Sequence, residues 1–180
     1  MGKIFQLNIK LLTIILFTVM STKTVKASKS NFITLKTSKG SIIIKTLPKI
    51  APNHVKRIKE LVSSGFYNGI IFHRVIEGFM AQTGDPLGNG TGGSGKNLKA
   101  EFSDYKYKYG TVGMARSMNP DSGDSQFFIC FDGCGHLTGQ YTVWGQVETG
   151  MEVVEKIEIG EPPSNPDQII EAFVGKKKTK

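Results

Sequence analysis

Short runs of β-branched and aromatic residues, separated by residues that favour turns, recur through this chain of 180 residues. They are Phe32–Thr37, Ser41–Leu47, Thr111–Met114, Gln126–Phe131, Tyr141–Val147 and Gln168–Val174. Ser38, Lys39 and Gly40 separate the first two runs, which indicates a hairpin. Many short strands with few helices are typical of an antiparallel barrel or sandwich. Since no repeat or linker interrupts the series, we expect one mainly β domain at residues 28–175.

Helical patterns are confined to two segments. Apolar residues repeat at helical spacing across Val55–Val62, after Pro52 and before Gly65, which are typical first and last residues of a helix. His54 falls in the first turn of this helix, and we expect it to be exposed. Met151–Ile157 predicts a second, short helix.

The first 27 residues have the order of a secretory signal peptide. Two lysines precede the uncharged run Leu11–Thr22, and Val25–Ala27 offers small residues at the spacing of a cleavage site. That run is shorter than the roughly 18 residues of a membrane span. We therefore expect residues 1–27 to be removed, leaving a chain that begins near Ser28, has no stable membrane span and is exported to the periplasm or secreted. An uncleaved N-terminal anchor is the alternative.

The net charge of +8 does not belong to the body of the chain. Eight of the 23 basic residues lie in the leader and in the basic tail at residues 176–180, which leaves 15 basic against 15 acidic residues in the body. A nucleic-acid-binding protein concentrates its basic residues on the folded face. We therefore expect no nucleic-acid partner, and we interpret the tail as a solvated end of the chain.

Two motifs suggest ligand sites on first inspection. Gly90–Asn97 matches a phosphate-binding loop except at Asn97, but no helical pattern follows it, so we interpret the match as accidental. Cys130, Cys134 and His136 include two thiols and an imidazole, but a fourth zinc ligand is not evident. We favour a disulfide over a metal site; a free Cys130 packed as a small hydrophobic residue is the other alternative. We expect no metal and no cofactor.

The stretch Phe72–Asp85 places polar residues among large apolar ones. The polar residues His73, Arg74 and Gln82 lie among phenylalanine, valine, isoleucine and methionine. Such a mixture predicts a pocket with an apolar floor and a few chosen polar groups. The simpler alternatives are a hydrogen-bonded structural His73 and a salt bridge from Arg74 to Glu77 or Asp85.

Taken with four later segments, this stretch resembles the cyclophilin family of peptidyl-prolyl isomerases in its compact bacterial form. The segments are Phe72–Asp85 (FHRVIEGFMAQTGD), Asn89–Gly93 (NGTGG), Gly113–Ser117 (GMARS), Ser125–Cys130 (SQFFIC) and His136–Gly145 (HLTGQYTVWG). The resemblance runs from Phe32 to Val174. It implies a closed eight-stranded antiparallel barrel capped by two helices. It also implies a monomeric enzyme, without cofactor, that accelerates rotation about X-Pro bonds of proline-containing polypeptides and so assists protein folding.

The resemblance assigns roles to individual residues. Arg74 matches the catalytic arginine of the family. The walls of the proline pocket match Phe79, Met80, Phe128, Leu137 and Tyr141. The groove that binds the substrate backbone matches Gln82, Ala115, Arg116 and Gln126.

Several positions depart from the family pattern. Arg116 stands where many members have Asn, and Tyr141 replaces a pocket histidine. His136 stands where well-studied eukaryotic members have a Trp that governs binding of cyclosporin, so we expect weak sensitivity to that drug. Two other roles stay open: a proline-binding module without catalytic purpose, and an interaction at the cell surface through the basic tail.

Overall fold

The computed structural model describes residues 30–176. The predicted signal peptide and its cleavage site lie outside the described residues, as does all of the basic tail except Lys176. Within residues 30–176, no helix is both long and apolar enough to cross a membrane.

Eight strands form a single antiparallel sheet, as predicted. They are β1 (Phe32–Thr37), β2 (Gly40–Thr46), β3 (Arg74–Ile76), β4 (Met80–Thr83), β5 (Thr111–Met114), β6 (Phe127–Cys130), β7 (Val143–Thr149) and β8 (Ile169–Val174). Their order in the sheet is β3-β4-β6-β5-β7-β2-β1-β8. The helices are α1 (Pro52–Ser63) and α2 (Met151–Val154), with 3₁₀ turns η1 (Pro120–Ser122) and η2 (Asp132–Leu137).

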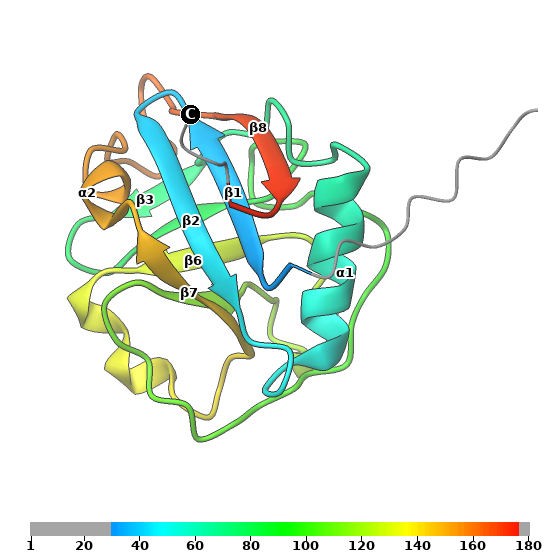
Figure 1. The fold of residues 1–180 in the computed structure, drawn as a ribbon. Helices are drawn as coiled ribbons and strands as arrows, with labels where there is room; N and C mark the ends of the chain where they lie inside the picture. Colours follow the sequence, from blue (N-terminus) through cyan, green and yellow to red (C-terminus); the bar gives the residue numbers. More distant parts are fainter. Residues whose placement is uncertain (1–29, 177–180) are drawn as a thin grey trace, which may run out of the picture.

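The sheet curls into a barrel whose seam lies between β3 and β8. Ahead of these two edge strands, an isolated bridge pairs Ile71 with Gln168. The predicted barrel is therefore present, although its seam is joined by a bridge rather than by a continuous ladder. The two predicted helices are present as well: α1 packs against β8 and β7, and α2 lies near β2 (Figure 1).

The apolar face of α1 closes one side of the main core. Val55, Ile58, Leu61 and Val62 are all buried in the same cluster as Trp144 of β7. Because these positions recur every three or four residues, they share one face of the helix. Burial of this face fixes α1 against the barrel.

His54 is buried, not exposed as predicted. Only 1% of it is accessible, and its Nδ1 lies 2.6 Å from Oε2 of Glu101. The Glu101 carboxylate also accepts the backbone N–H groups of Asn53 and His54, which have no partner within α1. A carboxylate from a distant loop therefore caps the helix and holds the imidazole inside.

A second, smaller apolar cluster lies beside the main core. Its buried members are Met80, Tyr107, Phe128, Cys130, Cys134, Leu137 and Val143. Cys130 of β6 and Cys134 of η2 form a disulfide, as favoured over a metal site. Within the described part of the chain, no group of three or more histidine, cysteine, aspartate or glutamate residues is placed to hold a metal. The disulfide fastens η2 to the strand beside it.

Candidate active site

Three neighbouring strands bring the polar and apolar candidates onto one face of the sheet. Arg74 of β3 lies opposite Gln82 of β4, and Gln82 in turn lies opposite Phe128 of β6. Directly opposed residues in antiparallel strands project to the same face, and so do residues two apart in one strand. Met80 therefore joins Arg74, Gln82 and Phe128 on this face.

Gly113 of β5 leaves room for the ring of Phe128. It is the partner of Phe128 in the next strand pair. A Cβ atom at position 113 would collide with the Tyr107 hydroxyl and would lie 2.5 Å from Cζ of Phe128. The absence of a side chain at Gly113 therefore lets the two aromatic rings stack, with their centroids 5.9 Å apart.

These residues line a cavity of about 300 Å³, the proline-pocket candidate. Its lining comprises Arg74, Phe79, Met80, Gln82, Ala115, Arg116, Phe128, His136, Leu137 and Tyr141. The floor of the cavity is apolar because the buried side chains of Met80, Phe128 and Leu137 form it. The structure thus brings together every predicted site residue except Gln126, which borders the cavity through a hydrogen bond from Gln82.

Ring contacts order one part of the cavity wall. The ring of His136 stacks on Phe79 with a centroid separation of 5.5 Å, and Tyr141 meets Phe128 edge to face at 5.8 Å. Both His136 and Leu137 belong to η2, which the disulfide ties to β6. The position of this wall therefore depends on η2.

Arg74 is paired with a residue that the sequence did not suggest. Its Nε donates to Oε2 of Glu161 at 2.6 Å, so the alternative of a salt bridge to Glu77 or Asp85 is wrong. Asp85 instead accepts backbone N–H groups of the Gly-rich loop. Burial opposes the charge on Asp85, but these hydrogen bonds outweigh it and hold its pKa below the ordinary value.

His73, next to Arg74, is buried, but neither ring nitrogen finds a hydrogen-bond partner among the described residues. The prediction of a hydrogen-bonded histidine is therefore wrong. Burial lowers the pKa of His73, and the charge of Asp85 acts in the opposite direction. The side chain of Gln126 also raises this pKa, although it forms no hydrogen bond with either ring nitrogen of His73. His73 is consequently expected to be neutral at pH 7.

The side chain of Arg116 links two loops at the rim. Its Nε and Nη2 donate to the Gln140 carbonyl at 3.3 and 3.0 Å, and its Nη1 donates to the Ser117 carbonyl at 2.9 Å. The guanidinium carbon lies 4.4 Å from the centroid of the Tyr141 ring. Its donors are therefore largely engaged by the protein, and a cation–π contact holds Tyr141 in place.

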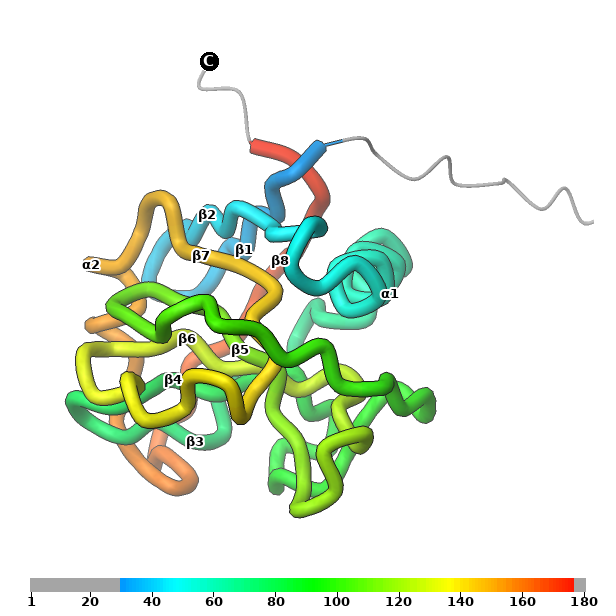
Figure 2. Tube along the Cα trace, turned by 90° about the horizontal axis from the view of Figure 1, so that it is seen from below, coloured from blue at the N-terminus to red at the C-terminus, as the bar shows by residue number. Residues whose placement is uncertain are grey.

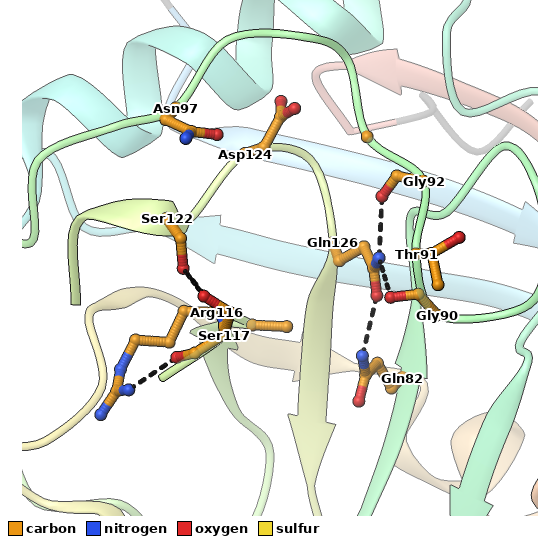
Figure 3. A pocket seen from close by; sticks show the side chains of 12 residues that line it. Gln82, Gly90, Thr91, Gly92, Asn97, Arg116, Ser117, Ser122, Asp124 and Gln126 are labelled. Atoms are coloured by element: carbon orange, nitrogen blue, oxygen red, sulfur yellow. Dashed lines mark hydrogen bonds between the residues drawn. The ribbon is translucent and has the colours of Figure 1, made fainter. Parts of the chain in front are cut away.

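A second cavity of about 280 Å³ adjoins the first and shares Gln82, Ala115 and Arg116 with it. Figure 3 shows Gln126 in the wall of this second cavity: its Nε2 donates to the carbonyls of Gly90 and Gly92, and its Oε1 accepts from Gln82. The far wall carries polar side chains that sequence reasoning missed. They are Asn97, Ser122 and Asp124.

The walls of this second cavity are the loops that follow β4 and β5, which lie side by side (Figure 2). Leu98 and Gly123 form the bridge between the two loops, and Asp124 accepts the backbone N–H groups of Gly95 and Lys96. A Cβ atom at Gly93 would collide with the Asp124 carboxylate. Gly92 and Gly93, two of the glycines that imitate a phosphate-binding loop, thus allow close packing against the carboxylates of Asp85 and Asp124.

Comparison with known proteins agrees with this geometry. Residues 32–174 match the family model of the cyclophilin type peptidyl-prolyl cis-trans isomerase/CLD. A probable peptidyl-prolyl cis-trans isomerase of Brucella abortus is 49% identical over 165 residues, covering 82% of this chain and 84% of that protein. A peptidyl-prolyl cis-trans isomerase of Helicobacter pylori is 44% identical over 138 residues, covering 74% of this chain and 84% of that protein.

Solved structures with a similar fold have lower sequence identity. A cyclophilin type peptidyl-prolyl cis-trans isomerase of Cryptosporidium parvum superposes with a TM-score of 0.76 at 28% identity, covering 82% of this chain and 99% of that one. A cyclophilin of Hirschia baltica superposes with a TM-score of 0.74 at 29% identity, covering 82% of this chain and 75% of that one.

Proposed function

The chain belongs to the cyclophilin-type peptidyl-prolyl cis-trans isomerases, and we propose that it accelerates rotation about X-Pro bonds in exported polypeptides, with Arg74 as the catalytic residue. One observation carries the proposal: a guanidinium stands at the edge of an apolar cavity of about 300 Å³. Binding a proline ring requires only the apolar floor. The charged group therefore needs a role in the reaction.

The barrier to rotation arises from amide resonance and amounts to roughly 18–20 kcal/mol. In the twisted transition state the proline nitrogen becomes pyramidal and gains a lone pair. A guanidinium is always protonated and offers directed donors, so Arg74 can donate to that nitrogen. The planar amide has no free lone pair on nitrogen, so this hydrogen bond exists only in the transition state and lowers the barrier.

The surroundings of Arg74 favour the same reaction. The proline ring would rest on Met80, Phe128 and Leu137, where it excludes water and strengthens the hydrogen bond from Arg74. Gln82 lies opposite Arg74 and would hold the carbonyl group that precedes proline. The backbone at Ala115 and Arg116 lines both cavities and would bind the flanking residues of the substrate.

Arg74→Ala tests this proposal. The chain is expressed from Ser28, and the cis-to-trans conversion of a short X-Pro peptide is followed against an uncatalysed rate of roughly tens to hundreds of seconds. A hydrogen bond from a charged group contributes about 1.5–3 kcal/mol, so kcat/KM should fall about 10- to 150-fold. If the folded variant keeps a fast wild-type rate, Arg74 is not the catalytic residue; if both folded proteins show only the uncatalysed rate, the protein is a proline-binding module and not an enzyme.

We also propose that the protein acts as a monomer outside the cytoplasm. The leader at residues 1–27 supports export. The Cys130–Cys134 disulfide adds support, because disulfides persist in oxidising compartments. N-terminal sequencing of the protein from the periplasmic and extracellular fractions tests this: a start near Ser28 is expected, whereas a cytoplasmic chain that still begins at Met1 would contradict it.

A further inference from the structure

A loop far along the chain brings a carboxylate to Arg74. Gly160, after α2, pairs with Val75 of β3 through two backbone hydrogen bonds of 2.8 and 3.0 Å. This bridge places Glu161 beside Arg74, where Oε2 accepts from Nε at 2.6 Å. Two backbone bonds thus position the loop, and one charge-assisted bond joins it to the guanidinium.

The pairing leaves the outer nitrogens of Arg74 available. A guanidinium has five N–H donors, and Glu161 takes the one on Nε. Among the described residues, the other contact of the guanidinium is the sulfur of Met80, 4.0 Å from Nη1 and a weak acceptor. Glu161 therefore holds the Arg74 side chain through Nε and leaves the Nη donors free of this ion pair.

Arg74 also has space in which to turn away. A further cavity, of about 490 Å³, also borders its side chain and is lined by Arg74, Gln82, Glu161 and the Gly-rich loop, whereas Phe79, Met80 and Phe128 line only the proline-pocket candidate. The Arg74 side chain is 40% exposed and has several rotatable bonds. Without a partner at Nε, it would spend part of its time in this cavity rather than at the edge of the proline pocket.

We propose that Glu161 is a positioning residue for the isomerisation: it confines the Arg74 guanidinium to the edge of the proline pocket by fixing Nε. The inference rests on the proposed role of Arg74. The negative charge of Glu161 also partly offsets the positive charge of that guanidinium, and this would weaken the hydrogen bond from Arg74 to the substrate. The two effects oppose each other, so the direction of the change in rate shows which one prevails.

The test compares Glu161→Ala and Glu161→Gln with Glu171→Gln as a matched control. Glu171 is also an exposed glutamate in an ion pair, with Lys36, but it lies on β8 away from the site. An exposed ion pair contributes at most about 1 kcal/mol, so Glu161→Ala should lower kcat about 2- to 5-fold with KM nearly unchanged. Glu161→Gln, which keeps an acceptor but no charge, should fall between the wild type and Glu161→Ala.

A second readout does not depend on activity. The ¹H–¹⁵N NMR signal of Arg74 Nε should move and exchange faster with water in Glu161→Ala, and remain at its wild-type position in Glu171→Gln. An unchanged Nε signal, or a rate in Glu161→Ala equal to or above that of the control, overturns the inference.

Arg74→Ala in the same assay separates this inference from the proposed function. If Arg74→Ala loses the rate and Glu161→Ala does not, the positioning role of Glu161 fails and the catalytic role of Arg74 stands. If Arg74→Ala keeps a fast wild-type rate, the proposed catalytic role of Arg74 fails, and if wild type shows only the uncatalysed rate, the proposed function itself fails. An Nε signal that responds to Glu161→Ala would then report an ion pair without a role in catalysis, which also overturns the inference.

Discussion

Breaking the Cys130–Cys134 disulfide should destabilise the domain and loosen the proline pocket. The two cysteines are four residues apart in sequence, so the bridge closes a short loop. Loop-closure entropy for a ring of about five residues gives about 2 kcal/mol of stabilisation. In a domain of this size that corresponds to a fall in the unfolding midpoint of about 4–8 °C. Because Leu137 is carried on η2, which the bridge fastens, KM should rise as well.

The assay begins with the protein unfolded in reductant, since both cysteines are fully buried in the native fold. After refolding with reductant present, thiol titration should find two free thiols, and the midpoint is then compared with that of the oxidised protein by circular dichroism. The double variant Cys130→Ala/Cys134→Ala should show no response to reductant. If the reduced wild type has two free thiols and an unchanged midpoint and KM, the disulfide stabilises neither the domain nor the proline pocket.

Three further predictions follow from particular contacts. Gly113→Ala should displace the Phe128 ring and lower both the unfolding midpoint and the affinity for a proline peptide, measured by thermal unfolding and calorimetry; unchanged affinity would contradict the packing argument. Burial raises the pKa of Glu101, but hydrogen bonds from the His54 ring and from backbone N–H groups outweigh it and lower this pKa below 4.5. The ionised Glu101 should therefore stabilise the fold fully above about pH 4.5, and this contribution should vanish as the pH falls through the lowered pKa. Glu101→Gln should flatten that slope in acid denaturation, and an identical slope would rule the pair out. His136→Trp should strengthen the binding of cyclosporin in a fluorescence titration, because the family resemblance predicts weak binding by the wild type; equal affinities would show that position 136 does not govern the drug here.

The strands that sequence reasoning found are runs rich in β-branched and aromatic residues that are bounded by residues favouring turns. The runs at Phe32–Thr37 and Thr111–Met114 coincide with β1 and β5, and Gly40 marks the turn of the first hairpin. Both β3 and β4 were missed as strands, because they are short and carry Arg74 and Gln82. Residues that serve the site interrupt the apolar pattern by which a strand is recognised.

The missing parts of the site depend on contacts between distant segments. Nothing near His54 indicates burial, because Glu101, which makes burial tolerable, lies 47 residues further on. Arg74 likewise finds Glu161 at a separation of 87 residues. The pocket lining was found in advance through the family resemblance, whereas periodicity and composition alone indicated only that a pocket lies near Phe72–Asp85. Hydrogen bonds between loops leave no periodic signal in the sequence.

In the proposed mechanism, Arg74 binds the transition state rather than the substrate. The most direct test measures, for wild type and Arg74→Ala, both kcat/KM and the Kd of the same proline peptide, from NMR exchange and titration on one sample. We expect kcat/KM to fall about 10- to 150-fold while Kd changes by less than about threefold. Equal losses of rate and affinity would show that Arg74 serves uniform binding, and an unchanged rate would remove it from catalysis.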